Sequence, residues 1–202
     1  LIGGIPMNDK KILIPFILIT AVTFILNMTT QMTLPTFSVY LKHLEFPVGL
    51  IGAASLGIAL AAMFFRPVAA ILSRKMGSIN TGLVGTSLYI LAFTSFLIFK
   101  QPIMVVFARI IQGFGMGLVV TTLGALIAQI VPHDELLKGM NIYSLFSAAA
   151  GAIGPYIGMF LIADGTFPRL FATALATVIL GTLILAYLRY RVHLPLPKDL
   201  HT

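Results

Sequence analysis

The 202-residue sequence has no cysteine and no tryptophan, and only 9% of its residues are charged. The lack of cysteine excludes disulfide bridges and thiolate metal sites. Soluble domains have roughly a quarter charged residues, so the scarcity of charge excludes an ordinary soluble domain. With 58% hydrophobic residues and a mean hydropathy of +1.02, the chain has the composition of an integral membrane protein.

Acidic residues and histidines are scarce as well, and none of them falls within a long apolar run. The carboxylates are Asp9, Glu45, Asp134, Glu135, Asp164 and Asp199, and the histidines are His43, His133, His193 and His201. No nucleophile, base or metal cluster can therefore be assembled at membrane depth. We expect a protein that is not an enzyme, with no metal and no cofactor.

The net charge of +7 would favour a nucleic-acid partner if the protein were soluble. Here the basic residues lie in short clusters between apolar runs, which is the pattern that orients membrane helices. We therefore expect no nucleic-acid partner.

Six apolar runs are long enough to cross a bilayer, which takes about 20 residues each. They cover residues 11–40, 48–73, 80–99, 103–131, 139–163 and 170–190. The connections between them are short and leave no room for a soluble domain. The predicted organisation is a cytoplasmic segment over 1–10, a six-helix bundle over 11–190 and the start of a central cytoplasmic linker over 191–202.

Basic residues are distributed unequally between the two ends of these spans. One side holds Lys10, Lys11, Arg74, Lys75, Lys138, Arg189, Arg191 and Lys198, whereas the other holds only Lys42, Lys100 and Arg169. Since cytoplasmic loops carry the excess of lysine and arginine, both termini are predicted to be cytoplasmic. The expected location is the plasma membrane, crossed several times.

The spans also form a repeat. The first three begin about ninety residues before the last three, and the three crossings between them invert the second unit. The predicted fold class is an all-α membrane protein with six transmembrane helices arranged as a 3+3 inverted repeat.

Two polar residues, Arg109 and Gln112, stand near the start of the glycine-rich fourth span. An arginine at mid-membrane costs about 2.5–3.5 kcal/mol on insertion scales, so it normally faces protein or a water-filled cavity. Gln112 lies at i+3 on the same helix face. We interpret the pair as part of a substrate cavity that binds an anion, a carbonyl or a partner carboxylate. The alternative is an arginine that only pins helices through backbone carbonyls.

Polar residues also interrupt the first span, at Asn27 and Gln31. They share a helix face at i and i+4, and amides within a membrane need partners or a cavity. We predict that they line the cavity, with simple interhelical hydrogen bonds as the alternative. In the second span, Arg66 is close enough to the cytoplasmic end to extend its side chain to the interface.

Glycines at small-xxx-small spacing occur in the fourth and fifth spans. The pairs are Gly113 with Gly117 and Gly154 with Gly158, and such pairs allow two helix backbones to approach closely. Helix packing is a sufficient explanation for the glycines alone. Pro155 adds a kink that a moving gate could use.

Three segments, in this order, resemble the N-terminal half of the major facilitator superfamily. RPVAAILSRKMG, between the second and third spans, is similar to the family's loop signature. RIIQG resembles the arginine motif of proton-linked exporters, and GAIGPYIG resembles the Gly-Pro motif associated with antiporters. The resemblance covers nearly the whole chain.

This resemblance implies a secondary transporter with alternating access that exports a drug-like or metabolite substrate by proton antiport. The motif residues that it assigns are Lys75 and Gly77 in the loop gate, Arg109, Gln112 and Gly113 in the fourth span, and Gly154, Pro155 and Gly158 in the fifth. Arg66 and Arg74 lie in the same RPVAAILSRKMG segment, and we group them with the loop gate. The loop departs from the family pattern at Arg74, which replaces an aspartate. We hypothesise that Arg74 or Lys75 pairs with Asp134 or Glu135 instead.

Members of this superfamily normally have twelve spans, built from two six-helix halves. We therefore expect this chain to be the N-terminal half. Its partners are then a small-molecule substrate, protons, membrane lipid and a C-terminal six-helix half, in the same native chain or in a partner subunit. The alternatives are a proton-coupled importer and a non-transporting six-helix membrane subunit.

Overall fold

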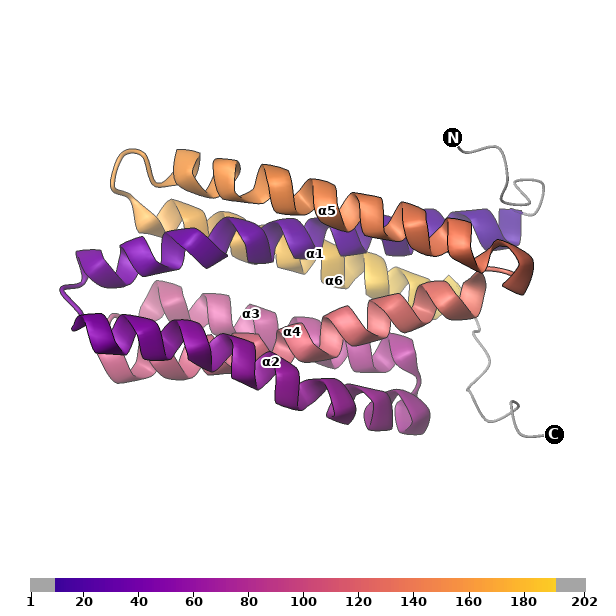
Figure 1. Cartoon of the computed structure of the whole chain (residues 1–202), viewed down its shortest axis with the longest axis horizontal. Coiled ribbons are helices and arrows are strands. Elements are labelled where there is room, and N and C mark those ends of the chain that lie inside the picture. The colour runs from indigo at the N-terminus through magenta and orange to yellow at the C-terminus, as the bar shows by residue number, and fades with distance from the viewer. Residues whose placement is uncertain (1–9, 192–202) are drawn as a thin grey trace.

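The computed structural model describes residues 10–191, so the predicted N-terminal segment and nearly all of the predicted linker lie outside the described residues. The helices are α1 (Lys10–His43), α2 (Val48–Met76), α3 (Ser78–Ile98), α4 (Pro102–Ile130), the 3-10 turn η1 (His133–Glu135), α5 (Leu136–Leu161) and α6 (Phe167–Arg191), shown in Figure 1. Within this range there is no strand, and six helices are long and apolar enough to cross a membrane. The six predicted spans are confirmed.

Proline and glycine mark where the helices begin and end. Pro47 is the residue before α2, and Pro102 is the first residue of α4, a position where the missing backbone N–H costs no helical hydrogen bond. Between α2 and α3 the chain turns at Gly77, whose φ of 87° lies in a region that glycine adopts without a side-chain clash. The Gly77 backbone N–H donates to the Ser73 carbonyl at 3.0 Å, which closes the end of α2.

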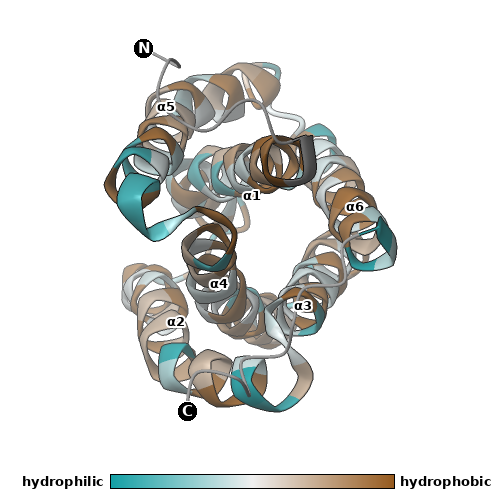
Figure 2. Ribbon diagram, turned by 90° about the vertical axis from the view of Figure 1, so that its right-hand side faces the viewer, coloured by the Kyte–Doolittle hydropathy of each residue, from teal (hydrophilic) through white to brown (hydrophobic). Residues whose placement is uncertain are grey.

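The helices pack as the inverted repeat predicts. If α1, α2 and α3 correspond to α4, α5 and α6, then packing of α1 against α5 is equivalent to packing of α4 against α2. Both of these contacts are extensive. The third helices of the two units, α3 and α6, pack against each other. In the view along the bundle, α1, α3, α4 and α6 surround the centre, whereas α2 and α5 lie outside α4 and α1 (Figure 2).

This arrangement leaves α2 and α5 least covered. In the most apolar 18-residue stretch of each helix, only 22% of α2 and 17% of α5 is buried in the bundle, compared with 44% of α1 and 50% of α4. Their uncovered faces carry large apolar side chains, including Phe64 and Met63 on α2 and Tyr156 and Phe160 on α5. Lipid or further apolar helices must therefore cover these two faces.

Candidate functional site

Arg109 lies inside the bundle, between α4 and α1. Its side chain is only 2% exposed. The guanidinium Nη1 donates to the Gln112 Oε1 at 2.6 Å, one helical turn further along α4. From the other side, the Phe37 ring of α1 faces the guanidinium, with 4.0 Å between Cζ and the ring centroid. A hydrogen bond and a cation–π contact therefore hold this buried cation.

Two donors of this pair remain without an acceptor. Both Arg109 Nε and Gln112 Nε2 are buried and make no hydrogen bond. The described carboxylates all lie in the connections between the long helices, at Glu45, Asp134, Glu135 and Asp164, and the one ion pair among the described residues joins Asp164 to Arg169. A buried charge is normally paired, so the arrangement is suited to receive an anion or a hydrogen-bond acceptor.

Asn27 is partly buried and lies further along the bundle than the Arg109 site. Ten residues separate it from Phe37 along α1, which is about 15 Å at 1.5 Å per residue. The Asn27 Nδ2 donates to the Thr23 carbonyl at 3.1 Å. Its side chain also lines a cavity of about 10 Å³, together with Tyr89 of α3 and Tyr143 of α5. That space is enough for about one water molecule.

Gln31 faces a different neighbour, although it shares the face of Asn27. A Cβ atom placed on Gly151 would lie 3.1 Å from the Gln31 Nε2, and one on Gly154 would lie 2.7 Å from the Gln31 Cβ. Gln31 is therefore packed in the contact between α1 and α5. The structure brings Arg109 and Gln112 together and places Asn27 and Gln31 apart from them, so a shared role for all four in binding substrate stays a prediction.

The four glycines of the small-xxx-small pairs lie where helix backbones meet. A Cβ on Gly113 would be 2.6 Å from the Ile58 carbonyl oxygen of α2, and one on Gly117 would be 2.6 Å from that of Ala62. On α5, a Cβ on Gly158 would collide with the Met32 carbonyl oxygen of α1. The two pairs thus serve the two equivalent contacts of the repeat, α4 with α2 and α5 with α1.

Pro155 lies between Gly154 and Gly158, and α5 continues through it from Leu136 to Leu161. Its side chain is partly buried. A role of this segment as a moving gate stays a prediction.

The residues of the predicted loop gate lie in the second half of α2 and in the turn that follows it. Arg66, Arg74 and Lys75 are exposed, and Gly77 forms the turn to α3. In this structure, no ion pair joins Arg74 or Lys75 to Asp134 or Glu135, so the hypothesised pairing is not formed among these described residues. The Glu135 Oε2 is buried and has no hydrogen-bond partner in this arrangement.

A buried hydroxyl pair, which was not predicted from the sequence, lies between α1 and α3. The Thr30 Oγ1 and the Tyr89 hydroxyl lie 2.9 Å apart, joining α1 to α3. Thr30 is one of six buried threonines in α1, which are Thr20, Thr23, Thr29, Thr30, Thr33 and Thr36. Each donates to the carbonyl four residues earlier. The frequent threonines of the first span were a signal that could have revealed buried hydroxyl groups in this helix.

Comparison with known proteins gives matches over most of the chain. The family model described as Major Facilitator Superfamily matches residues 19–201. "Quinolone resistance protein NorA" of Staphylococcus aureus is 26% identical over 138 residues, which are 68% of this chain and 36% of that protein. "Multi-drug resistance efflux pump PmrA homolog" of Lactococcus lactis subsp. lactis is 26% identical over 159 residues, which are 75% of this chain and 38% of that protein. The chain spans about half the length of these relatives.

Proposed function

Because this chain belongs to the Major Facilitator Superfamily, a family of transporters rather than enzymes, we propose that it is one half of a proton-coupled exporter. Its substrate is a small drug-like or metabolite molecule. Support for export comes from relatives that are named for quinolone resistance and multidrug efflux. Support for a half comes from their length, about twice that of this chain.

The observation that carries this proposal is the buried guanidinium of Arg109. It has one hydrogen bond and no carboxylate beside it among the described residues. In the transporter, the free donors of Arg109 and Gln112 bind a neutral or anionic acceptor, either on the substrate or on the second half. This chemistry favours substrates that carry a carbonyl or carboxylate.

Access to Arg109 requires movement, because the side chain is only 2% exposed and Phe37 covers it. The covering ring belongs to α1, whereas Arg109 belongs to α4. The contact between α1 and α4 is much smaller than the contact of α1 with α5 or that of α4 with α2. A shift of α1 against α4 therefore opens the site at little cost in packing, which is how substrate binding is coupled to alternating access in this proposal.

Proton exchange needs a titrating group within the membrane. The described carboxylates lie in the connections between the long helices, so in this proposal the coupling carboxylate belongs to the second six-helix half. The half described here contributes the cation and the amide.

The test uses the full native polypeptide, purified and reconstituted into vesicles with an imposed pH gradient. A quinolone is the probe, because that class is named in the Staphylococcus relatives. We expect quinolone to move against the proton flux. Arg109→Ala should abolish this movement, whereas the exposed Arg169→Ala should not. Movement in the same direction as protons would support the importer instead.

The intact mass of the native polypeptide distinguishes a complete transporter from the remaining alternative, a non-transporting six-helix membrane subunit. This chain has a mass of 21.8 kDa. A species near twice that value fits a complete transporter. A species at that value, with no flux in the vesicles, would support a non-transporting membrane subunit.

A further inference from the structure

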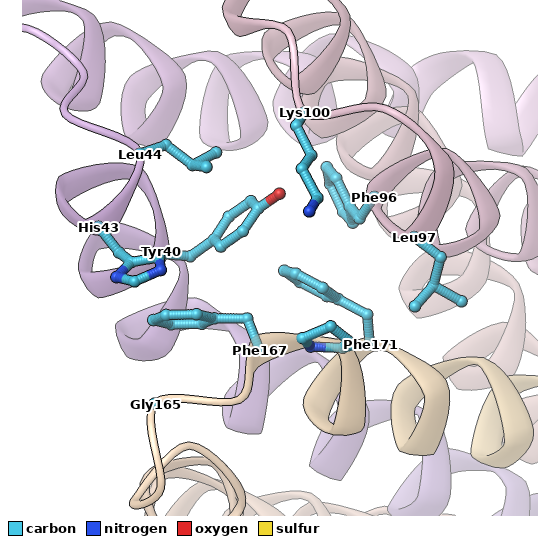
Figure 3. Close-up of a pocket in the computed structure, with 10 residues that line it drawn as sticks. Tyr40, His43, Leu44, Phe96, Leu97, Lys100, Gly165, Phe167 and Phe171 are labelled. Carbon is cyan, nitrogen blue, oxygen red and sulfur yellow. The ribbon is translucent and has the colours of Figure 1, made fainter.

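A second cavity lies at one end of the bundle, away from the glycine contacts and independent of the proposed function. It has a volume of about 120 Å³ and opens where α1 and α3 end and α6 begins (Figure 3). Its lining includes Tyr40 of α1, Phe96 of α3, Phe167 and Phe171 of α6, and Lys100 of the α3–α4 connection. Three helices and a loop therefore build the site.

The aromatic side chains form a preassembled wall. The ring of Tyr40 lies 4.9 Å from that of Phe171 and 5.2 Å from that of Phe167, measured between centroids. Phe96 and Phe171 are 5.2 Å apart. Such pairs stabilise each other by about 0.5–1.5 kcal/mol beyond their burial. The wall is therefore stabilised by its own ring contacts in the absence of a ligand.

The hydrogen-bond donors nearest the centre of this cavity come from two side chains, and the His43 ring also lines it, 5.1 Å from the Phe167 ring between centroids. The Lys100 ammonium and the Tyr40 hydroxyl face the same space (Figure 3). Among residues 12–191, Lys100 forms no ion pair, and no hydrogen bond joins the Tyr40 hydroxyl to another side chain or carbonyl. Asp164, beside the lining residue Gly165, is paired with Arg169 at 2.9 Å. The donors are therefore free to bind an anion.

The position of the cavity limits what can enter it. The outer faces of α3 and α6 carry exposed apolar side chains such as Leu91, Ile98 and Leu183, as expected of helices in contact with lipid. The cavity lies at the ends of these helices, where hydrocarbon gives way to headgroups. Its volume is below the roughly 300–1,000 Å³ of pockets for drug-sized ligands, so it accommodates a headgroup rather than a whole drug molecule.

From these observations we propose that the cavity binds the phosphate or carboxylate head of an anionic amphiphile, supplied by the surrounding membrane lipid. The ammonium of Lys100 and the hydroxyl of Tyr40 bind the anionic group. The aromatic wall excludes water from one side of it, and the apolar part of the ligand extends along α3 and α6.

Native mass spectrometry of the full polypeptide in detergent tests this site. The probes are phosphatidylglycerol, phosphatidylcholine and inorganic phosphate, each titrated separately. We expect phosphatidylglycerol to bind most tightly, and Lys100→Gln to weaken that binding about five- to tenfold. Tyr40→Phe, which keeps the ring, should weaken it as well. Lys42→Gln is the matched control, because Lys42 is exposed at the same end and does not line the cavity.

Each other outcome contradicts the proposal in a defined way. Equal binding of phosphatidylglycerol by Lys100→Gln and by the unmodified protein would overturn the anion site. Equal binding of phosphatidylcholine and phosphatidylglycerol would do the same. Tight binding of inorganic phosphate that depends on Lys100 would overturn the lipid as the source and assign the site to a soluble anion. Thermal melting of each variant in detergent shows whether it is folded.

Discussion

Arg109 and Gln112 form a buried hydrogen bond of 2.6 Å between Nη1 and Oε1, within a single helix. The bond is local, since both residues belong to α4, yet it lies in the contact between α4 and α1. Gln112 is fully buried. The Gln112 amide oxygen therefore acts as the hydrogen-bond acceptor for the buried Arg109 cation, which has no carboxylate beside it among residues 10–191.

Removing the acceptor should destabilise the protein. Gln112→Leu keeps a side chain of similar size and leaves a buried guanidinium nitrogen unpaired. Hydrogen bonds to charged groups contribute about 1.5–3 kcal/mol, so we expect the free energy of unfolding in detergent to fall by about that amount. Gln101→Leu is the control, because Gln101 is exposed and makes no capping hydrogen bond. Equal stability of the two variants would show that the bond contributes nothing.

The sequence predicted the six helices well because the physical signal is local. Each span is a run of apolar residues with proline, glycine or charged residues at its ends, and no predicted boundary differs from the structure by more than three residues. The hydrogen bond between Arg109 and Gln112 is also local, because residues three apart share a helix face.

What the sequence could not provide is the identity of neighbours across the bundle. Phe37 covers Arg109 from a helix that is 72 residues away along the chain. Asn27 and Gln31 share one helix face but have different surroundings. Asn27 lines a small cavity with Tyr89 of α3 and Tyr143 of α5, whereas Gln31 packs against Gly151 and Gly154 of α5. Hydrophobic periodicity reports which face of a helix is buried, and it carries no information on which helix covers that face.

Removing the Thr30 hydroxyl should lower the free energy of unfolding more than removing the Tyr89 hydroxyl. The Thr30 hydroxyl also donates to the Leu26 carbonyl at 3.0 Å, so Tyr89 supplies the proton of the bond between them. Thr30→Val leaves a buried phenol donor without an acceptor and should cost about 1–3 kcal/mol. Tyr89→Phe removes the donor itself and should cost less. Denaturant unfolding of both variants measures the difference, and the opposite order would contradict the assignment.

Glycine substitutions should separate close helix contacts from ordinary helix positions. A Cβ on Gly113 would lie 2.6 Å from the Ile58 carbonyl oxygen, so Gly113→Ala should force α4 away from α2 and cost about 1–3 kcal/mol. Gly124, on the same helix, is the matched control, since its nearest neighbour would be 3.9 Å away. Gly124→Ala should be neutral or stabilising, because alanine favours helix over glycine by about 1 kcal/mol. Equal melting temperatures for both variants would contradict the close contact.

Single cysteines can establish the orientation in the membrane, because the sequence contains no cysteine of its own. Lys75 lies at the end of α2 and Lys100 in the α3–α4 connection, at opposite ends of the bundle. From the excess of basic residues on the Lys75 side, we expect a membrane-impermeant maleimide to label Lys100→Cys in intact cells. Lys75→Cys should be labelled only after the cells are opened. The reverse pattern would place both termini outside.

The contact between Phe37 and Arg109 should contribute to stability in proportion to its burial. Cation–π contacts contribute about 0.5–1 kcal/mol at exposed sites and about 2 kcal/mol when desolvated, and Arg109 is only 2% exposed. A double-mutant cycle with Phe37→Leu and Arg109→Gln should therefore give a coupling free energy of about 1–2 kcal/mol. Phe24→Leu is the control, because Phe24 also lies on α1 but contacts Phe146 of α5, and its effect should add to that of Arg109→Gln.

Phe37→Leu and its control Phe24→Leu also test whether the contact between Phe37 and Arg109 limits access to the cation. If α1 must move off α4 to expose Arg109, then Phe37→Leu weakens the closed arrangement without removing the cation. We expect a maleimide to react faster with a cysteine at Val106, a partly buried α4 position one turn before Arg109, in the Phe37→Leu background than in the Phe24→Leu background. Equal reaction rates would mean that Phe37 only packs against Arg109, and that access to the cation is controlled elsewhere.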